Sequence, residues 1–360
     1  MKRVFISDCE GPISKNDNAF ELTAHFVPEG DKLFTVISRY DDVLADVFKR
    51  VGYKAGDTLK LILPFLRAYD VTNQKMQMFS AESLILIASV KEAIQHIKAL
   101  AHAFIVSTSY EHYIRALCKT IDFPFENVYC TKLDVDKYHI QEKEKAKLYG
   151  LAKEISQMPV IQIPPNAKSI EDFSMEEQKA IRRLDEIFWG EIALMRCGQI
   201  FSEVNPVGGR EKAEAIKDAV RRVGTSLADV MYVGDSITDV EAFRLVRENG
   251  GLTVSFNGNQ YAVKNAEIAI LSENSIVTAI IAEVFCRFGK KPTLQLVENW
   301  SRETLKKSHV KENLLNRFFE LYPKELPKVE LVKSENVEAL AVESSEFRKR
   351  VRGEAVGRLG

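Results

Sequence analysis

Short apolar runs rich in valine and isoleucine alternate with amphipathic helical patterns in the first and last parts of the chain. The runs occupy residues 3–7, 102–107, 229–234, 251–256 and 267–271. Strands separated by helices form parallel sheets that helices cover on both faces. The pattern therefore predicts an α/β fold with a doubly wound parallel sheet.

Two long, mainly helical stretches interrupt this alternation. Residues 14–85 separate the first apolar run from the second and are too long for a simple crossover, so they predict an inserted helical domain. Residues 132–197 predict a second helical insertion, in which Ser174 and Glu177 form a capping box. The predicted core then comprises 1–13, 86–131 and 198–288.

The last part of the chain, residues 289–360, lacks a strand signal and is interpreted as a charged extension of helices and linker. It ends with a basic cluster at 348–352. Because the cluster is short and glutamates surround it, a solvated helix face is the preferred interpretation, with RNA or an acidic partner as the alternative.

Composition limits the classes of partner and compartment. The 360 residues include 50 basic and 51 acidic side chains, and this near balance gives no general attraction to nucleic acid or an anionic membrane. The five cysteines form no zinc-site or disulfide pattern. Neither a secretory leader nor a membrane-spanning apolar stretch is recognised, so we expect a cytoplasmic protein.

Paired acids leave two of the predicted strands. Asp8 and Glu10 follow the first run, and Asp235 and Asp239 follow the run at 229–234. Ligands of open parallel sheets bind beyond the carboxyl ends of the strands, so the four acids are expected to converge. Hard oxygen ligands of this kind suit Mg²⁺. The alternatives are a solvated strand end for the first pair and a simple helix N-terminal acid for Asp239.

A hydroxyl pair and a lysine complete the candidate chemistry. Ser107 and Thr108 end the second run just before a helical pattern, where backbone N–H groups favour an anion. Lys212 follows a glycine pair at the start of another helical pattern. Together with Mg²⁺ these groups describe a phosphoryl pocket. Ser107 could instead cap the helix, and the competitors of Lys212 are Arg210, Lys217 and Lys264.

The ordered motifs carry a family resemblance. An acidic pair before glycine at the first strand, a hydroxyl at the second, a lysine and then G-D-x-x-x-D resemble the haloacid dehalogenase superfamily of aspartate-nucleophile phosphohydrolases. The resemblance covers residues 1–12, 85–130 and 198–285. It implies a Rossmann-type core with a helical cap at 14–85 that closes over the site.

The resemblance also implies roles for the motif residues. Asp8 would be the nucleophile, and Glu10 would serve as acid and then base while its carbonyl binds Mg²⁺. Ser107 and Thr108 would bind phosphoryl oxygens, and Lys212 would neutralise the negative charge. Asp8, Asp235 and Asp239 would hold the metal or orient its waters.

Two features bear on activity and substrate. The second acid is Glu10, although these phosphatases usually carry aspartate there, and a shift of about 1 Å can cost roughly a hundredfold in rate. Arg39, Tyr40, Asp41 and Asp42 are candidate substrate-facing residues of the cap, and a helix with an acidic first turn explains the acids equally well.

The resulting functional prediction is a Mg²⁺-dependent phosphatase of a small phosphorylated metabolite. One alternative is phosphonate or carbon–halogen cleavage on the same nucleophile. Another is a non-catalytic or regulatory subunit of a redox assembly, with a protein partner. A resemblance favours this second alternative. Similarity to an archaeal subgroup labelled, in methanogens, energy-converting hydrogenase A subunit R is found in residues 38–66 and in the terminal R-V-R-G pattern.

Overall fold

A seven-stranded sheet organises one half of the molecule, with the strand order β3-β2-β1-β4-β5-β6-β7. The computed structural model describes residues 3–359. The first six strands pair in parallel and the last pair is antiparallel. The strands are β1 (Val4–Ser7), β2 (His102–Tyr110), β3 (Val128–Thr131), β4 (Val230–Gly234), β5 (Leu252–Phe256), β6 (Ile268–Leu271) and β7 (Lys328–Leu331). The predicted doubly wound sheet is confirmed.

The strand order reverses at β1, which lies between β2 and β4. All residues of β1 and β4 are buried, as expected for parallel strands covered on both faces. The N–H of Asp8 donates to the carbonyl of Val233 at 2.8 Å, so the two strands stay paired to their ends. A crevice for a ligand is expected beyond this switch point.

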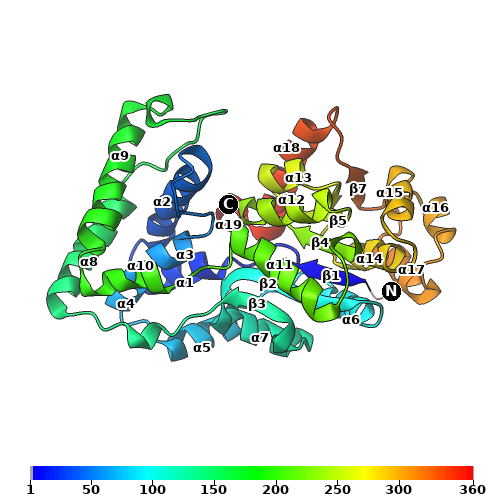
Figure 1. Ribbon diagram of the computed structural model, residues 1–360, viewed down its shortest axis with the longest axis horizontal. Helices are drawn as coiled ribbons and strands as arrows, with labels where there is room; N and C mark the ends of the chain where they lie inside the picture. The colour runs from blue at the N-terminus through cyan, green and yellow to red at the C-terminus, as the bar shows by residue number, and fades with distance from the viewer. Residues whose placement is uncertain (1–2, 360) are drawn as a thin grey trace.

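Helices cover both faces of the sheet (Figure 1). On one face their apolar side chains form a cluster with β1 and β4 that includes Ile216 and Phe243. On the other face a larger cluster includes Ile94, Ile114 and Ile280. The helices of the first face are α11 (Arg210–Val223), α12 (Val240–Glu248) and α13 (Gln260–Asn265), and those of the second are α6 (Val90–Lys98), α7 (Glu111–Ile121) and α14 (Ile276–Phe288).

A separate helical body lies beside the sheet, on the left of Figure 1. Both predicted insertions contribute to its single core, which includes Ile37, Leu148 and Leu184. The predicted capping box of Ser174 and Glu177 is present. The helices are α1 (Asn18–Phe26), α2 (Gly30–Asp42), α3 (Thr58–Leu61), α4 (Leu63–Ala68), α5 (Asn73–Ser83), α8 (Glu142–Ser156), α9 (Met175–Asp185) and α10 (Ile200–Glu203). We call this body the cap.

The C-terminal part corrects one sequence prediction, because it contains a strand. β7 pairs with β6 at the sheet edge, and its charged residues Lys328 and Glu330 explain why no strand signal was recognised. Leu296 and Phe318 join the core of the sheet domain, so this part is not a detached linker. Its helices are α15 (Lys290–Glu298), α16 (Arg302–Lys306), α17 (Glu312–Leu321), α18 (Val337–Arg352) and α19 (Glu354–Gly357).

Within residues 3–359, helices long and apolar enough to cross a lipid bilayer are absent.

Candidate active site

Three buried aspartates meet at the switch point of the sheet. Asp8 follows β1, Asp235 follows β4, and Asp239 precedes α12. One carboxylate oxygen of each lies within 4.8 Å of the others. The structure thus brings together three of the four acids that the sequence placed at strand ends.

Lys212 is the cationic side chain of this cluster. Its Nζ lies 2.6 Å from Asp8 Oδ2 and 2.7 Å from Asp239 Oδ1, and its side chain is fully buried. Burial lowers its pKa, but the Asp239 and Asp8 carboxylates more than offset this and raise it above its ordinary value. Among the alternatives, Lys217 pairs with Glu214 and Lys264 with Glu338 outside the crevice.

Asp239 has both oxygens occupied by protein donors. Lys212 and the Tyr232 hydroxyl donate to Oδ1, and the N–H groups of Asp235 and Ser236 donate to Oδ2 at 2.8 and 3.0 Å. Burial raises the pKa of Asp239, but the Lys212 charge and the hydrogen bonds to the carboxylate outweigh this effect and leave the pKa below its ordinary value. A Cβ on Gly234 would lie 2.5 Å from Asp239 Cγ, which explains the glycine of the G-D-x-x-x-D motif. Asp239 therefore anchors the lysine and the turn after β4.

Of the three aspartates, Asp8 has the most exposed side chain. Its Oδ2 accepts from Lys212, and its Oδ1 accepts from the N–H of Cys9 at 2.6 Å. Burial raises the pKa of Asp8 to about 7 against the opposing effect of Lys212, and the neighbouring Asp239 and Asp235 add to the rise. An additional cation would favour the ionised form that a nucleophile requires.

Glu10 reaches from the sheet domain to the cap. Its Oε1 accepts from the N–H of Asn18 at 2.7 Å, at the start of α1. Burial, together with the nearby Asp17, raises the pKa of Glu10 well above its ordinary value. The carboxyl is therefore favoured in its protonated form, and it lines the same cavity as Asp8.

The two predicted hydroxyls have different environments. Ser107 is buried, and its Oγ accepts from the N–H of Ser109 at 3.2 Å. Thr108 lines the cavity, and its buried hydroxyl lacks a hydrogen-bond partner among the described residues. Thr108 is thus the hydroxyl better placed to bind a ligand oxygen.

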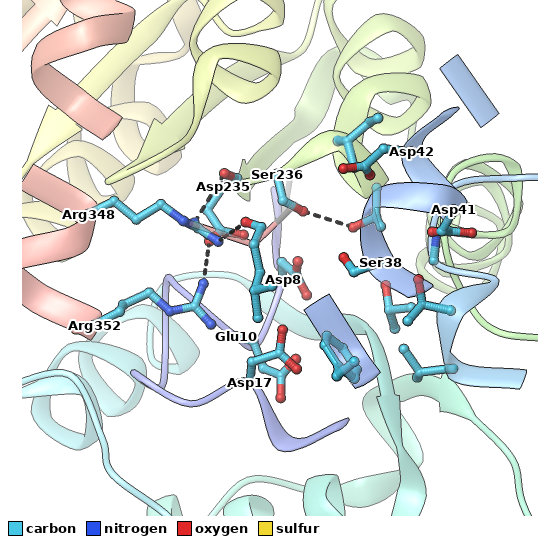
Figure 2. A pocket seen from close by; sticks show the side chains of 18 residues that line it. Asp8, Glu10, Asp17, Ser38, Asp41, Asp42, Asp235, Ser236, Arg348 and Arg352 are labelled. Carbon is cyan, nitrogen blue, oxygen red and sulfur yellow. Dashed lines mark hydrogen bonds and ion pairs between the residues drawn. The ribbon is translucent and has the colours of Figure 1, made fainter. Parts of the chain in front are cut away.

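A cavity of about 100 Å³ lies between the acids and the cap. Figure 2 shows Ser38, Asp41 and Asp42 on the cap side of the cavity, with Asp8 and Asp235 on the other side. Of the other predicted cap residues, Tyr40 is buried in the cap core and bonds to Asp185, whereas Arg39 pairs with Asp42 at 3.1 Å.

Two arginines of α18 also line the cavity, and sequence reasoning missed them. Arg348 and Arg352 both contact Asp235 Oδ2, the latter at 3.1 Å (Figure 2). Their side chains are 3% and 4% exposed, so the predicted solvated helix face is wrong for these two residues, whereas Arg350 of the same cluster is exposed. Their spacing of four residues places them on one helix face, which was the available signal.

The donor set suits a hard divalent cation, because buried carboxylate oxygens converge here. Asp239 is saturated by protein donors, so Asp8 and Asp235 are the carboxylates that remain to bind a metal. One oxygen of Asp235 is engaged by the arginines in this structure.

Comparison with solved structures supports the fold over the whole chain. Gene product AF1437 from Archaeoglobus fulgidus is 26% identical, with a TM-score of 0.79 over 100% of this chain and 99% of that chain. Apo and substrate-bound phosphoserine phosphatase are 12% and 13% identical over 76% of this chain and 96% and 95% of theirs. Both TM-scores are 0.41. A search of curated proteins found no match.

A family model gives the assignment. The model for haloacid dehalogenase-like hydrolases matches residues 71–283, which is more than half of the 360-residue chain. The matched part includes Thr108, Lys212, Asp235 and Asp239, and Asp8 joins them in the folded structure. The sheet order and the acids at its switch point agree with this match, and the chain belongs to the haloacid dehalogenase-like hydrolase family.

Proposed function

We propose that this protein is a Mg²⁺-dependent phosphohydrolase that cleaves a small phosphate monoester through an aspartyl-phosphate on Asp8. The observation that carries the proposal is the buried contact between Asp8 and Lys212 at the switch point, beside Asp235. A carboxylate held by a cation in a closed crevice has the environment of a nucleophile.

The first half-reaction transfers the phosphoryl group to the enzyme. An Asp8 oxygen forms a bond to phosphorus, and the bond from phosphorus to the ester oxygen breaks. Glu10, whose raised pKa keeps a proton available, protonates the departing oxygen to give an alcohol. Lys212 offsets the negative charge at Asp8, and the Thr108 hydroxyl donates to a phosphoryl oxygen.

The second half-reaction restores the enzyme. Glu10, now ionised, takes a proton from water as the water oxygen attacks phosphorus, and the bond between Asp8 and phosphorus breaks. Inorganic phosphate leaves. Mg²⁺ bound by the Asp8 and Asp235 carboxylates, with the Glu10 carbonyl, would supply positive charge for the phosphoryl oxygens.

The size and position of the cavity favour a small substrate. About 100 Å³ lies between the acids and α2 of the cap. The bond from Glu10 to the first turn of α1 links the proposed acid to the cap. Cap closure would therefore align Glu10 and exclude water at the same time.

The test is phosphate release from a panel of monoesters, with Mg²⁺ and with EDTA. We expect metal-dependent release that Asp8→Asn lowers at least roughly a thousandfold, because the covalent step is lost. The exposed Asp122→Asn, at the end of α7, is the control and should keep full activity. Release that persists in folded Asp8→Asn protein would refute the proposed nucleophile.

A non-catalytic or regulatory role is the second candidate. The contact of Arg348 and Arg352 with Asp235 favours it, because two guanidinium groups lie where a metal ligand is expected. Absence of turnover on every ester, together with stable co-purification of a larger redox assembly, would support this candidate over the hydrolase.

A further inference from the structure

The last turns of α18 bring two cationic groups to one carboxylate oxygen. Arg348 and Arg352 lie four positions apart, and both contact Asp235 Oδ2. Figure 2 shows the two guanidinium groups converging on Asp235 from the side opposite the cap acids. They come from a segment outside the matched family region, which ends at residue 283.

Backbone carbonyls hold both guanidinium groups in place. Arg352 Nε donates to the carbonyl of Lys15 at 2.9 Å, and a terminal nitrogen of Arg352 donates to Asn16. Arg348 also donates to the carbonyl of Asp235 at 3.3 Å. These bonds connect α18 to the loop between β1 and α1, so the guanidinium groups are held in defined positions beside Asp235.

The three clustered aspartates are matched in formal charge by the cationic side chains that contact them. Three cationic side chains contact the three aspartates: Lys212 with Asp8 and Asp239, and Arg348 and Arg352 with Asp235. A divalent cation added to this set would lie beside two buried guanidinium groups that repel it. It would also need ligand oxygens from Asp235, one of which both arginines use.

We propose that Arg348 and Arg352 compete with a divalent cation for Asp235 and thereby set the cation affinity of the crevice. The pair must leave Oδ2 for the cation to bind there. This inference rests on the cation site of the proposed function, and its test measures cation binding without turnover.

The first half of α18 is held by contacts that do not involve the two arginines. The Ser344 hydroxyl donates to the carbonyl of Gly258 at 2.7 Å, and Leu340 packs against Val263 and Leu271. After Arg352 the helix stops at Gly353, where φ is +87°. Withdrawal of the two arginine side chains from Asp235 would therefore leave the contacts of Ser344, Leu340 and the core residue Val351 in place.

The first experiment is calorimetric titration with Mg²⁺ of the wild type, Arg348→Gln, Arg352→Gln and Arg350→Gln. Arg350 lies on the same helix, is exposed and stacks on Phe347, so its variant is a matched charge control. We expect either crevice variant to lower the Kd for Mg²⁺ by roughly tenfold, a typical coupling between two binding events. Arg350→Gln should match the wild type. Equal or weaker binding by both crevice variants would overturn the proposal.

A second measurement uses the wild type alone, in case a crevice variant fails to fold. Saturating Mg²⁺ should accelerate amide hydrogen exchange in residues 345–359, because the arginines lose their contacts. Exchange that is unchanged while Mg²⁺ binds would overturn the inference and leave the proposed function standing. Failure of every form to bind millimolar Mg²⁺ would refute the cation site itself, and both proposals with it.

Discussion

At the scale of single residues, close packing around Asp235 decides which side chains the crevice tolerates. Gly11 has a φ of +100°, which side chains other than glycine rarely adopt. A Cβ built on it would lie 2.1 Å from Asp235 Oδ2. The glycine of the first motif is therefore required both by its backbone conformation and by the position of Asp235, which follows the neighbouring strand.

We expect Gly11→Ala to displace Asp235 and to cost more stability than Gly52→Ala. Gly52 also has a positive φ, of +77°, but open space surrounds the position of its Cβ. The control should lose only the conformational term, about 1–2 kcal/mol, and keep wild-type Mg²⁺ binding. Urea unfolding and Mg²⁺ titration measure the difference. Equal losses in the two variants would contradict the steric argument.

At the scale of elements, α2 joins the cap to the cavity through a buried carboxyl. Asp41 accepts from the Tyr53 hydroxyl at 2.6 Å and from the N–H of Gly56 at 2.9 Å, which fixes the following loop. Burial raises the pKa of Asp41 to about 8 against these bonds, and the neighbouring Asp42 and Asp57 contribute to the rise. Asp41 is thus a structural acid of the cap as well as a cavity residue.

This raised pKa predicts the direction of the pH dependence. Between about pH 4 and pH 8 folded Asp41 holds a proton that the unfolded chain releases, so the free energy of unfolding falls as pH rises. Asp41→Asn should remove up to about 1.4 kcal/mol per pH unit of that slope. Exposed Asp31→Asn, on the same helix, is the control. Urea unfolding across this pH range measures the slope of the free energy of unfolding against pH. The same slope in the wild type and both variants would refute the assignment.

At the scale of the whole molecule, the C-terminal segment connects the two bodies. α19 lies between the cap and the sheet domain (Figure 1). Arg39 of the cap donates to the carbonyl of Arg358 at 2.7 Å, and Leu359 packs in the cap core. Val351 of α18 packs in the core of the sheet domain. The segment therefore holds the cap close to the crevice.

Ending the chain after Gly353 should loosen the cap while Arg348 and Arg352 remain. The loss of the buried Leu359 side chain removes about 2 kcal/mol of contact energy, so α2 should exchange its amide hydrogens faster. Arg358→Ala is the control, because its exposed side chain pairs with Glu354 and its backbone carbonyl persists. Unchanged exchange in α2 of the shortened protein would show that the cap is held by other contacts.

Local sequence patterns were sufficient to predict the sheet and the acids at its strand ends. Buried strands read as apolar runs, and parallel pairing aligns their carboxyl ends, so Asp8 and Asp235 meet as a direct consequence of topology. Lys212 follows from the same logic, because α11 leads into β4. The short edge strand β7 was missed because two of its four residues are charged.

The sequence by itself therefore determined the family, the parallel core and the positions from which the acids, Thr108 and Lys212 approach the crevice. Only the tertiary structure decided that Arg348, 113 positions beyond Asp235, packs against it. A strand end is aligned by local pattern and register, whereas the docking of α18 depends on apolar packing against Val263 of α13 and on hydrogen bonds to the loop after β1. For that reason Arg348 and Arg352, which the sequence assigned to a solvated helix face, are instead buried in the candidate active site.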